Sequence, residues 1–555
     1  MKKAAAVRCA WALILLGSAA RAQWSATEEA LLQAQLGGLG GVGSAVEVQG
    51  DRCVVGYPRG SSGLSGRAMV YRRSAGSWTI EQTLQAADDI VGNLFGNALA
   101  LDGDTLVVGA RGTVVNGFGL AGAAYVFVRS GTTWTQQAKL VASDPEQNAE
   151  FGYALTLDGD TCAVGAPQST TNSTQYAGAT YVFVRNGSSW TQQQRIVPNA
   201  PFSYIYGSRS GRAVALAGNS LLIGAPTSFD LASNTILAGR VFEWVRSGSS
   251  WSQVAELTPN DAPDGRQFGC SIGYDGSRAI IGAWSENDLP SGTSVGTAYV
   301  FRRAAGWQQE AELPRAGIDN GDNFGLSVDL DGARAVVGAQ NAASSAGTST
   351  GTLRVFEFDG ATWGEKLALA GSATAVGDKL GTAVALDGTM LIAGAPAASV
   401  PGLSSGEAYV WRIGAGPHAY CTAKTNSLGC VPAVGWSGSA SASSAAAFSV
   451  SATQVLNQKL GLAFYGFAPT AAPFQGGFLC VEPPTRRRVS TNSGGSPLGS
   501  DCSGSYSYEF NALIQSGSDP ALTAGADLYV QFWYRDPASP STTGLTNALH
   551  ALIQP

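Results

Sequence analysis

A glycine-centred signature recurs seven times between residues 43 and 395, and it constrains the fold more than any other feature of the chain. It consists of a glycine, a short apolar run and a Gly-Ala pair or a variant of that pair, as in FGYALTLDGDTCAVGAP at 151–167. The first glycines of the seven signatures, 53 to 59 residues apart, are Gly43, Gly96, Gly152, Gly211, Gly269, Gly325 and Gly381. A fixed period of this length is typical of repeat architectures.

Each repeat contains four segments with the pattern of short strands. In the second repeat these are about 96–101, 105–110, 123–129 and 134–141. Four strands per repeat, seven times over, predict an all-β fold with a seven-bladed β-propeller, because a β-helix needs much shorter coils. The low share of charged residues, 13%, and the 72 glycines agree with a turn-rich all-β chain.

The first segment of each repeat alternates small and large residues, as Ala98 and Leu99 show in the second repeat. Alternation with a period of two puts the small side chains on one face of a strand. We expect this strand to be the innermost of each blade, where the blades crowd together. Glu47 and Asp329 depart from the pattern, since they replace small residues at one inner-strand position.

The two ends of the repeat region complement each other. The last repeat stops after GEAYVW at 406–411 and lacks a tryptophan segment, whereas Trp24 stands before the first repeat without a blade of its own. We therefore expect the N-terminal segment to supply the outer strand of the last blade, which would close the ring and leave no open sheet edge there. The alternative is that residues 26–36, ATEEALLQAQL, form a short helix.

These motifs resemble the FG-GAP repeat family, which forms the N-terminal propeller of integrin α chains and occurs in many bacterial surface proteins. The resemblance covers about residues 24–413 and rests on FG-like and GAP-like motifs at seven regular positions. It implies an extracellular propeller used for adhesion or recognition more often than for catalysis.

An Asp-Gly pair lies between the first and second segments of five repeats, where the family often holds a calcium loop. LDGDT occurs at 101–105 and again at 157–161. Calcium needs about six to eight oxygen ligands from a loop that wraps the ion, and a two-residue connection cannot wrap it. Asp-Gly between apolar runs indicates instead a type I′ hairpin turn, in which both central residues have positive φ. We therefore expect turns here, and no calcium or other cofactor.

The opposite face of the propeller is expected to carry the long connections, at 111–121, 198–210, 226–238 and 284–295. Long loops on a rigid scaffold are the usual place for binding. The ligand-binding candidates are four aromatic residues that could stack on a glycan or anchor a protein: Phe202, Tyr204, Tyr206 and Trp284. The alternative is that these rings pack beneath their own loops.

Residues 1–22 have the features of a secretory signal peptide. Lys2 and Lys3 give a basic start, WALILL at 11–16 is the apolar centre, and ARA at 20–22 fits a small-x-small cleavage site. The apolar run is too short to span a bilayer, and no other stretch is long enough. We expect a secreted or cell-envelope protein with no membrane span after signal removal; a retained signal anchor is the alternative.

The net charge of −6 would become −10 after loss of this segment, which holds four basic side chains. Such an excess of acid argues against a nucleic-acid or anionic-membrane partner. We expect a monomer that meets a protein or a glycan at the extracellular surface.

Residues 418–555 follow a short linker at 414–417 and differ in composition from the repeat region, 23–413. Strand-like segments at 459–467, 477–482, 505–513 and 528–534 predict a small β-sandwich. Four cysteines predict two disulfides; sequence order favours Cys421 with Cys430 and Cys480 with Cys502, but three pairings are possible. The motifs CTAKTNSLGC and QFWYRDP resemble C-terminal modules of exported bacterial proteins, for which no activity is implied.

Recognition or adhesion is the function that these features favour. The repeat region has no histidine, because both histidines of the chain, His418 and His550, lie beyond it. This excludes a Ser-His-Asp triad or a His metal site in the propeller. Glu47 and Asp329 could support a paired-carboxylate hydrolase or lyase at the channel mouth, but they belong to blades one and six and are not obvious partners. We expect no enzyme; a purely structural envelope component is the remaining alternative.

Overall fold

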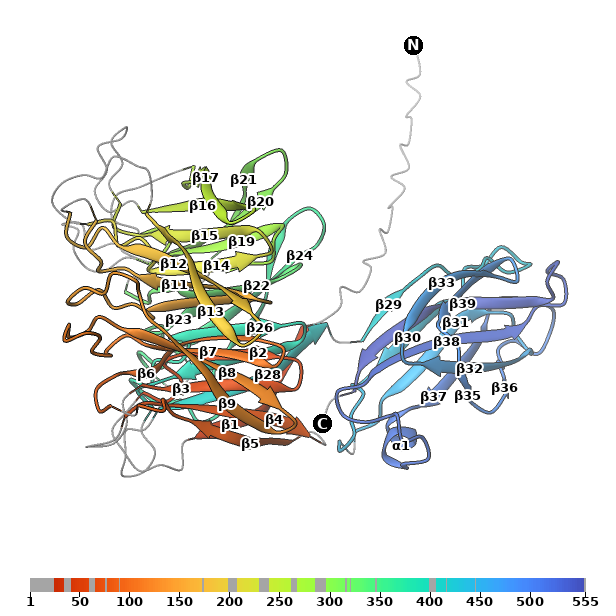
Figure 1. The fold of residues 1–555 in the computed structure, drawn as a ribbon. Coiled ribbons are helices and arrows are strands. Elements are labelled where there is room, and N and C mark those ends of the chain that lie inside the picture. Colours follow the sequence, from red (N-terminus) through yellow and green to blue (C-terminus); the bar gives the residue numbers. More distant parts are fainter. Residues whose placement is uncertain are drawn as a thin grey trace, which may run out of the picture. The chain divides into compact units, whose positions relative to one another are not determined.

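The chain divides into two compact units, Ala26–Ile413 and a second that contains Gly414–Pro555. The computed structural model describes residues 24–33, 41–58, 65–74, 77–88, 90–171, 174–197, 207–228, 239–260, 267–284, 296–314, 317–319, 321–344, 347–398, 406–415, 417–444 and 446–553. Both units are built almost entirely of strands (Figure 1). Within these ranges no helix is long and apolar enough to cross a bilayer. The expected signal peptide, 1–22, lies outside the described residues.

The Ala26–Ile413 unit consists of four-stranded antiparallel sheets, of which the described residues form seven. The first strands of the sheets are β2 (Val46–Gln49), β6 (Phe95–Asp102), β10 (Ala154–Asp158), β14 (Ala213–Ala217), β18 (Ser271–Tyr274), β22 (Phe324–Asp331) and β26 (Ala383–Asp387). The second strands are β3 (Arg52–Tyr57), β7 (Thr105–Ala110), β11 (Thr161–Ala166), β15 (Ser220–Ala225), β19 (Arg278–Ala283), β23 (Arg334–Ala339) and β27 (Met390–Ala395). The third strands are β4 (Arg67–Ser74), β8 (Ala123–Ser130), β12 (Ala179–Asn186), β16 (Arg240–Ser247), β20 (Thr297–Arg303), β24 (Thr352–Phe358) and β28 (Glu407–Ala415). The fourth strands are β5 (Ser77–Leu84), β9 (Thr133–Leu140), β13 (Ser189–Ile196), β17 (Ser250–Leu257), β21 (Trp307–Glu312), β25 (Trp363–Leu369) and β1 (Trp24–Gln33).

The sheets are blades of a closed ring. The first strand of each sheet contacts the first strand of the next, from β2 beside β6 through to β22 beside β26, and β26 contacts β2 again. First strands therefore lie innermost, as expected, and the architecture is the all-β propeller that the repeats predict. β28 runs on to Ala415, so the strand includes the start of the expected linker at 414–417.

The N-terminal strand closes the ring. β1 pairs with β28 as the outermost strand of the last blade, so the expected closure is confirmed and the helical alternative for this segment is wrong. Glu29 of β1, whose side chain is 1% exposed, accepts hydrogen bonds from Arg73 Nε of the first blade (2.7 Å) and Arg412 Nε of the last (2.8 Å). Burial alone would raise the pKa of Glu29, but the bonds from Arg412 and Arg73 outweigh it and lower that pKa.

Two glycines in each repeat allow neighbouring blades to approach closely. A Cβ added at Gly109 would lie 2.3 Å from the carbonyl oxygen of Gly152, the first glycine of the next repeat. Gly152 has a φ of 87°, which residues with side chains rarely adopt. The same contact recurs around the ring, at Gly56–Gly96, Gly109–Gly152, Gly165–Gly211, Gly224–Gly269, Gly282–Gly325, Gly338–Gly381 and Gly394–Gly43. The glycine signature is therefore an interblade packing motif, and its last pair joins blade seven to blade one.

The alternation of small and large residues on the inner strands separates the two faces of each blade. Ala45 packs against the hydrophobic core between the first and second blades, and Ala154 against the core between the third and fourth, so small residues face the next blade. Leu99 belongs to the core shared with the preceding blade. Cys53 and Cys162 are buried in such interblade cores, and neither is disulfide-bonded.

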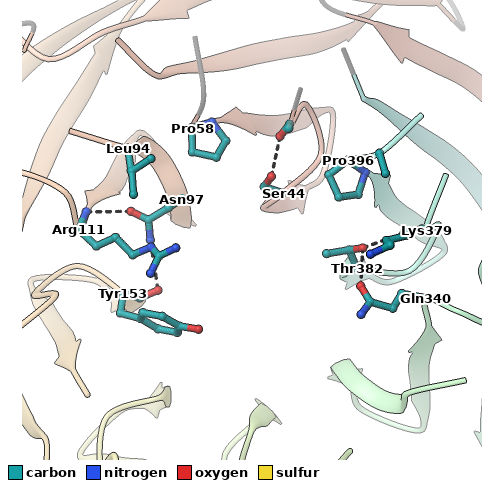
Figure 2. A pocket seen from close by; sticks show the side chains of 12 residues that line it. Ser44, Pro58, Leu94, Asn97, Arg111, Tyr153, Gln340, Lys379, Thr382 and Pro396 are labelled. Atoms are coloured by element: carbon teal, nitrogen blue, oxygen red, sulfur yellow. Dashed lines mark hydrogen bonds between the residues drawn. The ribbon is translucent and has the colours of Figure 1, made fainter. Parts of the chain in front are cut away.

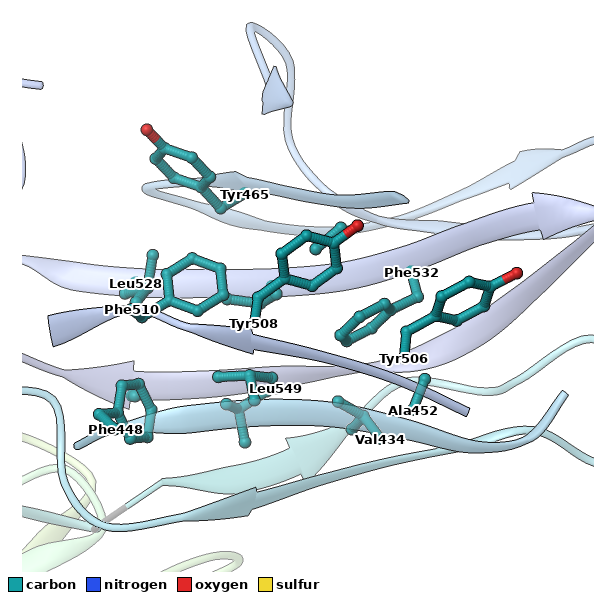
Figure 3. Close-up of a cluster of buried hydrophobic side chains, with 14 of the residues drawn as sticks. Val434, Phe448, Ala452, Tyr465, Tyr506, Tyr508, Phe510, Leu528, Phe532 and Leu549 are labelled. Carbon is teal, nitrogen blue, oxygen red and sulfur yellow. The ribbon is translucent and has the colours of Figure 1, made fainter. Parts of the chain in front are cut away.

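The second unit contains two sheets and a separate hairpin. One sheet has the order β29 (His418–Tyr420), β39 (Thr543–Leu552), β38 (Asp527–Arg535), β32 (Leu460–Gly466) and β35 (Arg486–Arg487), with β36 (Thr491–Asn492) also on β32. The other has β30 (Ala433–Ser437), β31 (Ser449–Val455) and β37 (Gly504–Glu509), and β33 (Pro469–Phe474) pairs with β34 (Gly477–Val481). Both sheets contribute to one core, in which Tyr506 of the smaller sheet stacks on Phe532 of the larger at 6.2 Å (Figure 3).

The disulfides join Cys421 to Cys480 and Cys430 to Cys502, so the pairing favoured by sequence order is wrong although all four cysteines are bonded. The reason lies in the packing of distant segments against the first two cysteines. Tyr420 Oη, next to Cys421, donates a hydrogen bond to the carbonyl of Cys480, and Asn426 Nδ2, in the turn before Cys430, lies 3.6 Å from Cys502 Sγ. Each cysteine is then bonded to a residue more than 50 positions away.

The predicted strand at 505–513 ends early. β37 stops at Glu509, and a short helix, α1 (Asn511–Gln515), follows. Glu509 causes the change, because its carboxylate accepts hydrogen bonds from the backbone N of Asn511 (2.8 Å) and Ala512 (2.6 Å). These are amide donors that the first turn of a helix leaves unpaired.

Candidate functional site

In six of the seven blades the first and second strands are joined by a two-residue Gly-X turn, and in the fifth blade three residues, 275–277, separate them. In the third blade Asp158 pairs with Thr161, so the turn residues are Gly159 and Asp160. Gly159 has a φ of 55°, whereas Asp160 is outside the positive-φ region. The expected Asp-Gly type I′ turn is therefore wrong by one residue: the aspartate ends the strand, and only the glycine adopts positive φ. The carboxylate of this strand-ending aspartate has a partner in the next blade.

That partner is the turn of the following blade. Asp158 Oδ2 accepts a hydrogen bond from Gly218 N (2.5 Å), and Asp102 Oδ2 accepts one from Gly159 N (2.7 Å). We call such a bond a turn latch. Three further latches join Gln49 to Gly103 (2.7 Å), Asp331 to Gly388 (2.6 Å) and Asp387 to Gly50 (2.6 Å).

Two junctions of the ring lack a latch among the described residues. In the fourth blade Ala217 occupies the latch position and has no acceptor in its side chain. In the fifth blade Asp275 binds its own turn instead, accepting hydrogen bonds from Ser277 N and Arg278 N at 2.7 Å each. The latches therefore join blades six, seven, one, two, three and four in one run, and blade five stands outside it.

The second aspartate of each DGD motif is paired with arginine. Asp160 accepts a hydrogen bond from Arg185 Nε at 2.6 Å. Asp104 lies 3.4 Å from both Arg129 and Arg52. Both carboxylates of the motif are thus engaged with protein donors, and the face that resembles a metal-binding face is a network between blades.

The opposite face carries three rings of equivalent positions around the inner-strand ends. The first ring lies two residues before the first glycine of each repeat: Gly41, Leu94, Glu150, Arg209, Gln267, Asn323 and Lys379. The second ring directly follows that glycine: Ser44, Asn97, Tyr153, Arg212, Cys270, Leu326 and Thr382. The third ring directly follows the Gly-Ala pair or its variant: Pro58, Arg111, Pro167, Pro226, Trp284, Gln340 and Pro396. All seven members of the first ring have positive φ, a conformation that is costly for side chains such as leucine and lysine.

An open pocket of about 530 Å³ lies within these rings (Figure 2). It is lined by Gly41, Ser44, Pro58, Leu94, Asn97, Arg111, Tyr153, Gln340, Lys379, Thr382, Pro396 and Ala397. These residues come from the first, second, third, sixth and seventh blades, so the pocket lies across the propeller axis and not between two blades. We call it the axial pocket. Its size falls within the range of small-molecule binding sites.

One wall of the axial pocket is built around Tyr153. The guanidinium carbons of Arg111 and Arg212 lie 5.2 and 4.7 Å from the centre of its ring. Arg111 is held from behind by Glu150 Oε1 at 3.0 Å. Asn97 fixes the wall further, because its Oδ1 accepts from Arg111 N (3.0 Å) and its Nδ2 donates to the carbonyl of Gly152 (2.9 Å).

The facing wall, on the right of Figure 2, carries Gln340, Lys379 and Thr382. Thr382 Oγ1 donates to Lys379 O at 2.8 Å and lies 3.0 Å from Gln340 Oε1, which orients that amide. Within the described part of the chain, Gln340 Nε2 and Lys379 Nζ make no hydrogen bond or ion pair with another residue. This wall therefore carries two available donor groups.

Two acidic side chains occupy the inner strands beyond the pocket lining. Burial raises the pKa of Asp329 to about 7 although its carboxylate accepts hydrogen bonds from Leu330 N and Leu386 N, both at 2.8 Å. Burial and then the charge of Asp329 raise the pKa of Glu47 well above its usual range. Glu47 and Asp329 belong to blades one and six, but a closed ring brings every inner strand close to one axis, so the charge of one can act on the other.

The aromatic candidates have different outcomes. Phe202, Tyr204 and Tyr206 lie outside the described residues. Trp284 is only 8% exposed, and its indole Nε1 has no hydrogen-bond partner among the described residues. It occupies the third ring, at the position equivalent to Arg111, Gln340 and Pro396, which line the axial pocket. The sequence analysis did not name the residues that line the axial pocket, although they stand beside the repeated glycines.

The second unit has a smaller cavity of its own, of about 390 Å³. It is lined by Leu462, Phe464, Phe474, Gln475, Leu479, Thr485, Arg487 and Trp533. Trp533 Nε1 lies 3.4 Å from Gln475 Oε1 at its edge. Five of its eight lining residues are apolar, whereas seven of the twelve residues that line the axial pocket are polar.

Five segments of the chain match the FG-GAP repeat family, at residues 78–127, 134–183, 251–301, 307–356 and 363–411. Each segment runs from the tryptophan of one outer strand through the first three strands of the next blade. Residues 24–71 and 190–244 fall outside the matched segments, yet they contribute the same set of strands to the ring. No curated protein matches the chain. The Ala26–Ile413 unit is therefore an FG-GAP β-propeller.

Proposed function

We propose that this chain is an exported recognition or adhesion protein that binds a protein or a glycan at the axial pocket of its propeller. The observation that carries the proposal is the difference between the two ends of the ring. Polar groups at the turn end bind one another across blades, whereas the axial pocket keeps donors on Gln340 and Lys379 without a described partner. FG-GAP propellers are commonly binding scaffolds, which supports the same function.

Export is part of the proposal. Two disulfides in the second unit suit an oxidising compartment outside the cytoplasm. The basic and apolar pattern of residues 1–22 is that of a secretory signal.

Binding without turnover is favoured over hydrolysis. The twelve residues that line the axial pocket include no carboxylate and no histidine that could act as a general acid or base. Glu47 and Asp329 are the candidate catalytic pair of acids, and neither residue lines the axial pocket. An enzyme would have to bring its substrate past the pocket to reach them.

A glycan array and an envelope pull-down with the full chain test the proposal. Gln340→Trp is the blocking variant, because the equivalent position of blade five already holds Trp284 and the larger ring would fill the pocket. Asp104→Asn, at an exposed position of the turn end, is the matched control. We expect Gln340→Trp to abolish capture and Asp104→Asn to leave it unchanged. Equal capture by both variants would exclude the axial pocket, and release of smaller products from a captured glycan would indicate an enzyme.

A further inference from the structure

We propose that the axial pocket recognises the oxyanion of a small acidic ligand, such as the carboxylate of an acidic sugar, with Arg111 and Lys379 on opposite walls. This inference rests on the binding function proposed above and adds the chemical class of the ligand. It is carried by the charge of the lining, by the way in which Arg111 is fixed, and by the available ammonium of Lys379.

The lining is cationic in an acidic protein. Arg111 and Lys379 are its charged members, and none of the twelve lining residues is acidic. The chain as a whole carries 40 acidic and 34 basic side chains. Acidic groups on the rest of the protein repel an anionic ligand, whereas the positive charge of the pocket attracts it. The ligand is therefore directed to the axial pocket.

Arg111 is held in position before any ligand arrives. Its backbone N is bound by Asn97, its guanidinium by Glu150, and its guanidinium carbon lies 5.2 Å from the centre of the Tyr153 ring. Glu150 neutralises part of the charge of Arg111, but Arg212 adds a second guanidinium on the same tyrosine. A guanidinium offers several N–H donors, so a contact with one carboxylate leaves others for a ligand.

The ring of Tyr153 is in contact with two guanidinium groups, which leaves little of its face for a ligand to stack on. With guanidinium groups 4.7 and 5.2 Å from its centre, the ring is already engaged in cation–π contacts. A neutral sugar that needs a bare aromatic face would therefore gain little here, whereas the ring strengthens the positive wall for an anion. The phenolic hydroxyl remains as a neutral donor, since it makes no hydrogen bond with a described residue.

Lys379 completes the site from the other side. It belongs to blade seven, whereas Arg111 belongs to blade two, and its side chain is exposed. Its backbone adopts a φ of 62°, and its ammonium has no carboxylate partner among the described residues. Gln340 Nε2 lies on the same wall as a neutral donor. Two cations from opposite walls, with neutral donors beside them, fit an oxyanion attached to a polar body.

Isothermal titration calorimetry with the full chain tests the inference, using galacturonic acid, galactose and inorganic phosphate as probes at low and at high salt. We expect galacturonic acid to bind at least about tenfold more tightly than galactose, because its carboxylate adds charge-assisted hydrogen bonds. High salt should weaken this binding. If phosphate binds about as tightly as galacturonic acid, the pocket recognises negative charge alone. If phosphate binds much more weakly than galacturonic acid, the sugar body contributes to binding. Both results support the proposal.

Lys379→Gln and Arg111→Gln test whether binding takes place in the axial pocket. Arg72→Gln is the control that removes one positive charge elsewhere, because Arg72 is an exposed arginine paired with Asp51 at the turn end. We expect each pocket variant to weaken galacturonic acid at least about tenfold and Arg72→Gln to have no effect. Lys379 is exposed, so its variant should keep the melting temperature of the parent protein even if Arg111→Gln is less stable. Equal affinity for galactose and galacturonic acid, unchanged binding by Lys379→Gln, or no binding of either anion would overturn the inference. If these titrations overturn the inference while capture on the array still depends on the pocket, the proposed binding function remains and only the anionic class of ligand is excluded.

Discussion

The two ends of the propeller use equivalent positions of the same repeat in different ways. At the turn end, side chains such as Asp102 and Asp158 bind the backbone of the neighbouring blade. At the pocket end, equivalent positions differ from blade to blade, with proline, arginine, glutamine and tryptophan all present in the third ring. A repeated role retains one kind of residue, whereas a single site on the axis needs a different residue from each blade.

The difference shows why a motif that resembles a metal loop is not by itself a functional site. The turn end contains the chemistry-bearing carboxylates, but these are used to hold blades together. The axial pocket has no acidic residue in its lining and has available donors on Gln340 and Lys379. Changes at the turn end should therefore alter stability and leave binding intact, and changes in the pocket should do the reverse.

Removal of β1 should have the largest effect, because both ends of the propeller depend on a closed ring. Deletion of residues 24–33 would remove the outer strand of the last blade and leave Arg73 and Arg412 without Glu29. We expect the melting temperature in a calorimetric scan to fall by more than about 10 °C, because two arginines lose a buried partner. Glu29→Gln keeps the strand and should cost about 3 kcal/mol. An unchanged melting temperature after the deletion would refute the closure.

Gly109→Ala should have the next largest effect, since it obstructs a blade junction that no side chain can occupy. The new Cβ would lie 2.3 Å from the carbonyl oxygen of Gly152. We expect a loss of about 3 kcal/mol in urea unfolding, because backbone must move. Gly306→Ala is the control, since a Cβ there meets nothing within 4 Å. Similar losses for the two variants would contradict the packing role of the signature.

Loss of one turn latch should be smaller still. Asp158→Ala removes the acceptor of Gly218 N at an exposed turn, and we expect a cost of about 1 kcal/mol. The measurement is the urea midpoint of the full chain, with and without calcium chloride. Calcium should stabilise neither the parent protein nor the variant, and a calcium-dependent gain that Asp158→Ala abolishes would favour an ion site over the latch.

Glu47→Gln should change how stability depends on pH. The pKa of Glu47 is raised in the folded state, so the folded chain keeps a proton that the unfolded chain loses, and stability falls as pH rises from the usual range of a glutamate. Glutamine does not titrate, so the variant avoids this loss of stability. Its free energy of unfolding should exceed that of the parent protein by on the order of 1 kcal/mol at pH 8 and equal it near pH 4. Urea unfolding across this range, with exposed Asp104→Asn as the control, measures the difference. A variant that is less stable than the parent at pH 8 would show that the charge is compensated.

The repeat pattern predicted the propeller because its information is local. Glycine spacing, alternation along Ala98 and Leu99, and the unmatched Trp24 each depend on a short stretch or on counting. Pairing across blades could not be predicted in this way. The bond between Asp158 and Gly218 joins residues 60 positions apart, and the disulfide between Cys430 and Cys502 joins residues 72 apart.

The sequence by itself determined the strand content, the period, the place of the N-terminal strand and the end of the ring that carries the short turns. Only the tertiary structure decided what each repeated side chain contacts: the next blade for the aspartates, a neighbouring carbonyl for the glycines, and a shared axial pocket for Arg111 and Lys379. The physical reason is that strand patterns arise from neighbours along the chain, whereas hydrogen-bond partners and pockets arise from neighbours that closure of the ring brings together.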